Sequence, residues 1–348
     1  MIESSFFGKG PDGEEISIFK LTNKNGLSAS VTDLGATWLS MEAPDRDGRI
    51  SDVLLGYDTV PLVYENPGYL GAIVGRNANR IKDAKFKLNG KIYSLCENDG
   101  KNNLHSGPDT LNKRVYSYII KDDKIIFSLE SPKYDQGFPG ELHIEVAYSL
   151  TDENEFKIEY LLEAGSEDTV ANFTCHPYFN LAGHDSGYAL KQEVFIDADF
   201  ITENDSTSVP TGRLLSVDGT PFDFRERKVI EKDIDKDDTQ LHYGGGYDHN
   251  FCINKREGKH PCAGAYDPIS GRYMEIFTDC DGIQFYTGNG LSKDIIGKNG
   301  AVYDRRCGYA FETQFYPNAI NIPEFRQPVL KAGKSFRSET SYKFSVIK

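Results

Sequence analysis

Strict alternation of apolar and polar side chains in two neighbouring segments is the feature that most constrains the fold of this chain. In residues 143–150 the even positions are Ile, Val, Tyr and Leu, while the odd positions are His, Glu, Ala and Ser. Residues 156–162 repeat the pattern, with Phe, Ile, Tyr and Leu at the even positions. A period of two predicts β-strands with one buried face and one solvent face. Because only Thr151–Asn154 separate the two strands, we expect an antiparallel hairpin.

Short polar turns between other apolar segments predict further hairpins. Asn89-Gly90 follows Phe86 and Leu88 and precedes Ile92, and Asn-Gly is the preferred pair for a type I′ turn. A second predicted hairpin joins residues 116–120 to residues 125–129 through the turn 121–124. A third joins residues 273–278 to residues 283–287 through the turn 279–282.

Helix signals are few, so the sequence predicts an all-β fold. One or two helical turns are expected near Pro61–Asn66, and the charged segment Arg225–Asp238 is expected to be a surface loop or a short helix. Gly and Pro are spread along the chain instead of marking one linker, and there is no internal repeat. We therefore predict a single domain over residues 1–348, built from two packed β-sheets.

Composition narrows the classes of function. The chain has 39 Lys and Arg against 53 Asp and Glu, and the net charge of −14 argues against a nucleic-acid partner because phosphates would be repelled. No apolar segment approaches the roughly 20 residues of a membrane span, and the N-terminus has no signal-peptide pattern. The six cysteines form no CxxC pair. We therefore expect no membrane partner, free thiols and a cytoplasmic location.

Two histidines lie in segments poorly suited to pure packing. His105 lies in a loop of small polar residues, and His176 lies among aromatic residues next to Pro177. An imidazole titrates near neutrality and can donate or accept a proton at working pH. The alternative for each is a hydrogen-bonded structural histidine.

Further polar candidates lie in a basic loop and in two strands. The loop Gly75–Ile81 offers the donors Arg76, Asn79 and Arg80, although a solvated turn would look the same. Asp248 lies at the entry to a predicted strand, and Glu312 lies inside an aromatic-rich strand. A carboxylate among aromatic residues is costly to bury ionised and often marks a tuned acid or base. Exposure on the solvent face is the alternative for Glu312.

Several sequence blocks together resemble the aldose 1-epimerase (galactose mutarotase) family. They follow one another along nearly the whole chain in the order of the family. The blocks are Thr32–Thr37, Gly75–Ile81, Asn103–His105, His176–Leu181, Gly246–His249, Ile283–Asn289, Phe311–Gln314 and a C-terminal strand with Tyr342 and Phe344. Each block is weak evidence alone, whereas the ordered set is strong.

The resemblance implies a large antiparallel β-sandwich with a pocket on a concave sheet face. It implies that Glu312 is the general base and His176 the general acid, and that His105 holds the substrate near its ring oxygen. It further implies that sugar hydroxyls are bound by Asn79, Arg80, Asp248 and Gln284, with Arg76 in a supporting position. The substrate would be a free aldohexose such as galactose or glucose, with no metal and no cofactor.

The implied chemistry is ring opening and reclosure of a cyclic hemiacetal. The hydroxyl on C1 loses a proton to the carboxylate of Glu312, and the ring oxygen gains one from the imidazolium of His176. Rotation about C1–C2 and reclosure then give the other anomer.

Four positions depart from the family pattern, and these put the sugar preference in doubt: Cys175, Ser106-Gly107, Tyr116 and Pro317-Asn318-Ala319.

Three other functions remain open at the level of sequence. A glycoside hydrolase would use Asp248 and Glu312 as its carboxylate pair, but that mechanism needs no histidine. A hexose-6-phosphate 1-epimerase would need more Arg or Lys at the pocket rim than Arg76 and Arg80. A non-catalytic sugar-binding domain could share the scaffold, since fold does not fix function. The oligomeric state, monomer or homodimer, and the preferred aldose are also left open.

Overall fold

The computed structural model describes all residues from 1 to 348. Its strands form sheets of nine, seven and five strands together with four two-stranded ribbons, and all strand pairs are antiparallel. The nine-stranded sheet runs in the order β12 (Ser117–Lys121), β13 (Lys124–Ser131), β14 (Leu142–Leu150), β15 (Glu155–Ala164), β29 (Ser335–Val346), β25 (Arg272–Thr278), β24 (Ala263–Tyr266), β19 (Glu193–Ile196) and β22 (Lys228–Val229).

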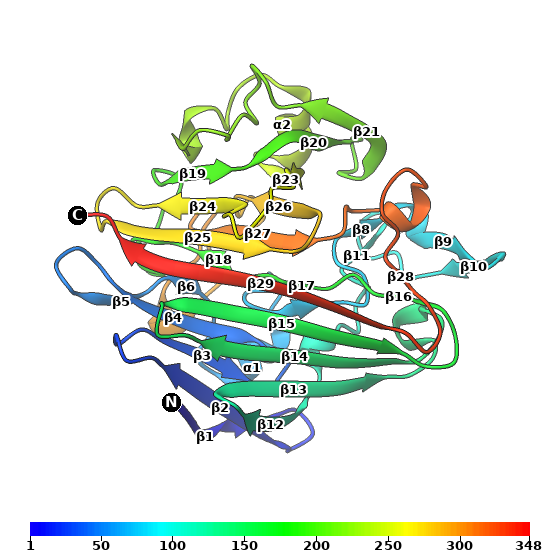
Figure 1. The fold of residues 1–348 in the computed structure, drawn as a ribbon, viewed down its shortest axis with the longest axis horizontal. Helices are drawn as coiled ribbons and strands as arrows, with labels where there is room; N and C mark the ends of the chain where they lie inside the picture. The colour runs from blue at the N-terminus through cyan, green and yellow to red at the C-terminus, as the bar shows by residue number, and fades with distance from the viewer.

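The other two sheets complete the framework. The seven-stranded sheet has the order β21 (Pro210–Ser216), β20 (Ala198–Asn204), β23 (Asp248–Ile253), β26 (Gly282–Tyr286), β27 (Tyr309–Gln314), β18 (Tyr178–Phe179) and β6 (Leu54–Leu55). The five-stranded sheet has the order β1 (Ile2–Lys9), β2 (Glu15–Thr22), β3 (Ser28–Thr32), β4 (Trp38–Pro44) and β5 (Ile50–Asp52). Figure 1 shows the long central strands of the nine-stranded sheet crossing the molecule in succession.

Short elements connect the sheets. The ribbons pair β9 (Lys85–Leu88) with β10 (Lys91–Ser94), β8 (Arg80–Ile81) with β11 (Asn103–Leu104), β7 (Ile73–Val74) with β17 (Thr174–Cys175), and β16 (Thr169–Val170) with β28 (Val329–Leu330). The α-helices are α1 (Val60–Glu65) and α2 (Thr239–Gly244), and single 3₁₀ turns occur at Lys82–Ala84, Leu111–Lys113, Asp135–Gly137, Ile230–Lys232, Lys298–Gly300 and Ala319–Asn321. No helix has the length and apolar character needed to cross a bilayer.

The sheets pack face to face around one large core, which confirms the predicted β-sandwich. Trp38 of the five-stranded sheet stacks on Phe156 of the nine-stranded sheet, with ring centroids 4.3 Å apart. The hydroxyl of Tyr342 on β29 donates to the carbonyl of Phe311 on β27 over 3.4 Å. A cluster of 56 buried apolar residues fills the space between the layers. Burial of these side chains removes apolar surface from water and is the main stabilising contribution to the fold.

The hairpins predicted from short turns are mostly confirmed. Strands β14 and β15 pair in register, with their even-numbered apolar residues facing the core over most of their length. Asn89 and Gly90 have φ angles of 50° and 81°, which is the positive-φ pair that a type I′ turn requires. Strands β12 and β13 form the second predicted hairpin. The predicted helical turns near Pro61–Asn66 are α1, and the segment Arg225–Asp238 is mostly irregular.

The third predicted hairpin is wrong. Strand β25 pairs with β24 and β29, whereas β26 pairs with β23 and β27 in the opposite sheet. The polar segment 279–282 therefore passes from one layer of the sandwich to the other. A turn signal indicates that the chain reverses direction, but the pairing depends on which neighbours lie beside each strand. Here the long C-terminal strand β29 lies beside β25.

The seven-stranded sheet sorts its residues onto two different faces. Its core face carries Phe251, Phe285 and Phe311, which belong to the large apolar cluster. Cross-strand partners share a face, and Gln284 lies directly opposite Glu312 on the neighbouring strand. Alternation therefore places Gln284 and Glu312 on the face that turns away from the core. All six residues of β27 are nevertheless buried, so Glu312 is not on a solvent face.

Candidate active site

A pocket of about 700 Å³ lies on this polar face of the seven-stranded sheet. It is lined by 21 residues that are far apart in the sequence, from Tyr57 to Glu312. Six of the seven residues predicted to act on a substrate are among them: Asn79, Arg80, His105, His176, Asp248 and Glu312. The seventh, Gln284, is buried behind the pocket wall and donates from its amide nitrogen to Asp248 Oδ1 over 2.6 Å.

Glu312 and His176 meet at the floor of the pocket. The Nε2 atom of His176 lies 3.4 Å from Oε1 of Glu312, and both side chains are almost completely buried. Strand β27 fixes Glu312, whereas His176 lies in the short connection between β17 and β18. The backbone of His176 is held on both sides, since its N–H donates to the carbonyl of Ala72 and its carbonyl accepts from Gly71. A strand and a hydrogen-bonded connection thus hold a carboxyl and an imidazole within reach of one small ligand.

Burial shifts the pKa of each member of this pair toward the neutral form. Loss of solvation raises the pKa of Glu312 well above its usual value, Asp248 raises it further, and Arg80 opposes the shift. Loss of solvation lowers the pKa of His176 to about 4, against weaker opposing effects from its own backbone and Asp248. Glu312 Oε2 and His176 Nδ1 are buried without a protein partner. The pair is therefore poised for proton transfer.

His105 is held as a neutral hydrogen-bond donor. The ring atom Nδ1 of His105 accepts the backbone N–H of Asn79 over 3.1 Å, and the backbone N–H of His105 donates to the carbonyl of Asn79 over 3.2 Å. The proton of the neutral ring must therefore be on Nε2, at the edge that faces the pocket. Burial lowers the pKa of His105 well below its usual value, and His176 and Arg80 add to this. Because Nδ1 already accepts from Asn79, a second proton is disfavoured there, and His105 is suited to donate a hydrogen bond to a ligand oxygen instead of serving as a cationic acid.

The tautomer of His105 also decides whether His105, His176 and Glu312 together suit a metal ion. Ligand atoms of His105, His176 and Glu312 all lie within 4.8 Å of one another. A metal would need a lone pair on Nε2 of His105, but that nitrogen carries the proton while Nδ1 accepts from Asn79. The donor set is therefore better suited to an oxygen-rich organic ligand than to a cation.

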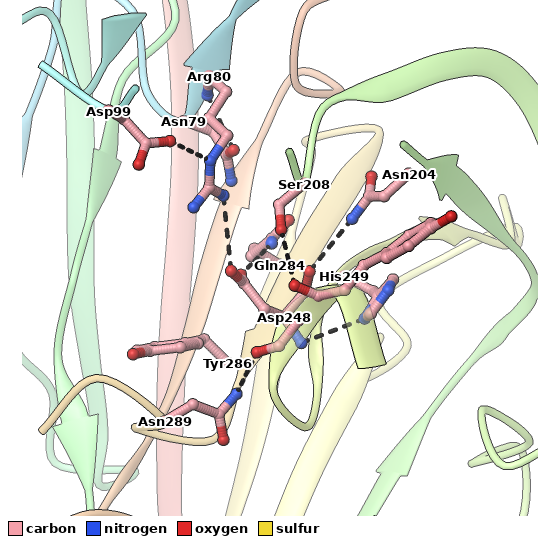
Figure 2. Close-up of polar contacts among 12 residues, drawn as sticks. Asn79, Arg80, Asp99, Asn204, Ser208, Asp248, His249, Gln284, Tyr286 and Asn289 are labelled. Atoms are coloured by element: carbon pink, nitrogen blue, oxygen red, sulfur yellow. Dashed lines mark hydrogen bonds and ion pairs between the residues drawn. The ribbon is translucent and has the colours of Figure 1, made fainter. Parts of the chain in front are cut away.

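Arg80 and Asp248 form the polar wall of the pocket. The Nη1 atom of Arg80 is 3.5 Å from Asp248 Oδ2, and Nε of Arg80 donates to Asp99 Oδ2 over 2.7 Å (Figure 2). Asn79 lies next to Arg80 and accepts the backbone N–H of Arg80 on its side-chain oxygen. This wall offers several fixed donors and acceptors to a ligand that carries hydroxyl groups.

Aromatic rings enclose the two histidines. The ring of Tyr178 stacks on His176 with centroids 4.9 Å apart, and Tyr69 lies 4.9 Å from His105. Tyr286 also lines the pocket, and its hydroxyl accepts the N–H of Gly290. Tyr178 and Tyr286 therefore offer aromatic rings to a bound ligand. Phe285 does not, because it points to the core on the opposite face of β26.

Arg76 does not reach the pocket. Its guanidinium is fully buried and donates to the carbonyls of Pro139 and Gly140 and to Thr169 Oγ1. Further donations go to the hydroxyl and carbonyl of Ser131 and to the carbonyl of Pro132. Arg76 therefore fixes the loop that precedes Asn79 and Arg80 without touching a ligand.

This role predicts a large loss of stability for Arg76→Met. The change keeps much of the side-chain volume but leaves buried carbonyl and hydroxyl acceptors without a donor, so the free energy of unfolding should fall by about 3–5 kcal/mol. Urea unfolding followed by circular dichroism measures the change. Arg213→Met is the matched control, since Arg213 is mostly exposed and should have a much smaller effect. An equal effect of the two substitutions would contradict this role.

Sequence reasoning does not find two further groups of residues. The first group is Tyr69, which lines the pocket and contacts His105, and Asp99, which lies outside the pocket wall and binds Arg80. The outer part of the pocket was also missed, and it is formed by the α1 region and the loop after β26: Leu62, Glu65, Pro67, Gly68, Leu291, Ser292, Asp294, Ile295 and Ile296. These positions carry no local pattern that separates them from ordinary surface residues.

Comparisons with known proteins find relatives over almost the whole chain. The family model described as aldose 1-epimerase matches residues 17–343. The chain is 39% identical to galactose mutarotase from Sus scrofa over 346 residues, which cover 99% of each chain. It is 38% identical to aldose 1-epimerase from Haemophilus influenzae, with 99% of this chain and all of the relative covered. Among solved structures, an aldose epimerase homologue from C. elegans superimposes with a TM-score of 0.88 at 29% identity, covering 99% of this chain and 100% of that one. The chain therefore belongs to the aldose 1-epimerase family.

Proposed function

We propose that this protein interconverts the α and β anomers of free aldohexoses, galactose and glucose among them, with Glu312 as base and His176 as acid. The observation that carries the proposal is the buried contact of 3.4 Å between Glu312 Oε1 and His176 Nε2. The hydroxyl on C1 and the ring oxygen of a hexose are bonded to the same carbon. A base and an acid this close together can therefore serve both atoms of one bound sugar at once.

The mechanism moves two protons, one from the sugar to Glu312 and one from His176 to the sugar. The carboxylate of Glu312 takes the proton of the C1 hydroxyl, while the imidazolium of His176 gives a proton to the ring oxygen. The bond from C1 to the ring oxygen breaks, and an open-chain aldehyde forms. After rotation about C1–C2, the former ring oxygen attacks the other face of the carbonyl carbon. The protons return, and the enzyme regains its starting state.

The buried pair can act because it carries a single proton throughout. The ion pair of Glu312 and His176 matches the closed sugar, and the neutral pair matches the open aldehyde. These two forms contain the same number of protons and differ only in which residue holds the proton. Burial favours the neutral form of each residue, so the neutral pair is the resting state. The ion pair that starts ring opening forms by transfer of one proton from Glu312 to His176 across their 3.4 Å contact.

The remaining site residues would orient the sugar. His105 donates from Nε2 to a substrate oxygen beside the acid, in keeping with the tautomer that Asn79 imposes. Arg80 and Asp248 bind hydroxyls by donating and accepting, and Gln284 acts through Asp248 by holding its carboxylate. Tyr178 and Tyr286 lie where they can cover the apolar face of the ring.

The charges of the pocket favour a free sugar over a sugar phosphate. Arg80 is the one Lys or Arg among the 21 lining residues, and it is already paired with Asp99 and Asp248. Glu65 and Asp294 add negative charge to the outer part of the pocket. A phosphate there would meet carboxylates instead of a cationic clamp, which argues against the hexose-6-phosphate alternative.

The wider setting belongs to the same proposal. We take residues 1–348 as one domain because the large core includes residues from Phe19 to Phe344. A reducing compartment such as the cytoplasm fits the six cysteines, none of which forms a disulfide. A free hexose is the expected partner, and the net charge of −14 argues against nucleic acid.

Polarimetry tests the proposal directly. Freshly dissolved α-D-galactose and α-D-glucose should reach their equilibrium rotation much faster with the protein than in buffer alone. Glucose 6-phosphate should show little acceleration, and oligosaccharides should release no new reducing ends. Rotation that decays at the buffer rate for both free sugars would overturn the proposed function.

The single-proton pair also predicts a bell-shaped dependence of kcat/KM on pH. Below the pKa of His176, about 4, both groups are protonated and no base is available, so activity rises as pH increases through this value. Above the raised pKa of Glu312 neither group holds a proton, so activity falls again. Between the two limbs the rate should be flat. Rates measured from pH 3 to 10, with circular dichroism as a control for folding, should show both limbs; a profile without a falling alkaline limb would contradict the two-group mechanism.

A further inference from the structure

Arg80 divides its hydrogen-bond donors between two carboxylates, and only one of them lines the pocket. Nε donates to Asp99 Oδ2 over 2.7 Å, whereas Nη1 lies 3.5 Å from Asp248 Oδ2. Asp99 is not part of the pocket wall, and its side chain keeps 34% of its surface exposed. Figure 2 shows the guanidinium between these two residues. The stronger contact of Arg80 is therefore with the carboxylate that a substrate would not touch.

This division leaves Asp248 with only a long contact of 3.5 Å on the side that faces Arg80. Gln284 already donates to Asp248 Oδ1 over 2.6 Å, so Oδ2 is the oxygen with capacity for a ligand. Arginine and carboxylate groups prefer a closed two-bond contact. If two nitrogens of the Arg80 guanidinium both bonded to the Asp248 carboxylate, this two-bond contact would occupy the acceptor and the donors that a sugar hydroxyl needs. Anchoring Nε on Asp99 keeps the Arg80–Asp248 contact long.

The loop that carries Asp99 is held firmly enough to act as an anchor. The backbone of Asp99 exchanges two hydrogen bonds with Asn102 across a tight turn. The side chain of Asn98 accepts the N–H of Leu104 and donates to its carbonyl. Leu104 pairs with Arg80 in the β8–β11 ribbon and directly precedes His105. One short loop thus fixes both the partner of Arg80 and the neutral donor His105.

We propose that Asp99 is a positioning residue for substrate binding, which holds the guanidinium of Arg80 so that its Nη donors and Asp248 Oδ2 remain available to sugar hydroxyls. The inference rests on the proposed function, because it assigns Asp99 to the recognition of the same hexose. Asp99 touches neither the sugar nor the proton-transfer pair, so its loss should weaken binding more than it slows the chemical step.

Two substitutions of Asp99 test this role by the split between KM and kcat. Asp99→Ala removes the acceptor, and KM for galactose should rise about tenfold, as expected for the loss of one hydrogen bond to a charged group. Asp99→Asn keeps an acceptor oxygen but removes the charge, so its KM should lie between those of Asp99→Ala and wild type. In both variants kcat should stay within about threefold of wild type, and the melting temperature should change little because Asp99 is partly exposed.

Combining Asp99→Ala with Arg80→Met in one protein shows whether Asp99 acts through Arg80. In an Arg80→Met background, Asp99→Ala should raise KM no further, since the residue it positions is gone. Glu97→Gln is the matched control: it removes a negative charge from the same loop at an exposed residue and should leave KM unchanged.

Each contrary result has a distinct meaning. An unchanged KM in Asp99→Ala, a fall in kcat without a rise in KM, or an equal rise in KM in the Arg80→Met background would overturn the positioning role alone. A wild-type protein that accelerates no mutarotation would overturn the proposed function, and this inference with it.

Discussion

Glu312→Gln should lower kcat for mutarotation of galactose by about 10²–10⁴-fold, the usual contribution of one positioned proton-transfer group. The amide has nearly the same shape as the carboxyl and can keep the contact with His176, but it cannot take the proton of the C1 hydroxyl. KM should change much less, because the hydroxyl-binding wall of Arg80 and Asp248 is intact. Initial rates from polarimetry at several sugar concentrations separate the two constants.

Stability and a matched variant serve as controls for this result. Glu312 is buried, and its raised pKa reflects a cost of burying the charged form, so the neutral amide should leave the melting temperature unchanged or raise it. Glu324→Gln makes the same chemical change at an exposed position and should retain the wild-type rate. A Glu312→Gln rate within tenfold of wild type would mean that another group is the base.

His176→Asn should also lower kcat by about 10²–10⁴-fold, because asparagine can donate a hydrogen bond but cannot transfer a proton. The double variant with Glu312→Gln should be little slower than either single variant, since residues that act as a unit are strongly non-additive. The same polarimetric assay measures all three. Both single variants should keep their fold, which circular dichroism checks.

His105→Asn distinguishes the two histidines. His105 is held as a neutral Nε2–H donor by the backbone of Asn79, so asparagine could replace part of its function. We expect a smaller loss of kcat than for His176→Asn, together with a rise in KM. If His105→Asn had the larger effect on kcat, the acid would be His105 and the assignment would have to be reversed.

Much of the fold was predictable because local alternation matches the final packing. The even-numbered apolar residues of β14 and β15 face the core over most of their length, and the Asn89-Gly90 turn has the expected positive φ angles. The connection between β25 and β26 was not predictable. A local turn signal does not show that β29, from the far end of the chain, lies beside β25 and that β26 joins the opposite sheet.

The site was predictable where polar residues interrupt apolar strands or lie in unusual loops. Glu312, Asp248 and the two histidines have such surroundings, and the pocket brings them together. Alternation alone was misleading at β27, because one face of this strand meets the core and the other meets the pocket, so both are buried. Gln284 and Asp99 could not be placed from sequence, since their contacts with Asp248 and Arg80 depend on how distant strands and loops meet.

The central claim is that the sugar ring opens between C1 and the ring oxygen, with Glu312 and His176 moving the protons. The most direct test follows galactose labelled with ¹⁸O on C1 by mass spectrometry while its rotation approaches equilibrium in the presence of the protein. Ring opening keeps the C1–O1 bond, so the label should be retained after the anomers have equilibrated, as in a control without protein at the same time. Loss of the label in step with the change in rotation would show that water replaces O1, as in a glycoside-hydrolase mechanism, and would contradict the account.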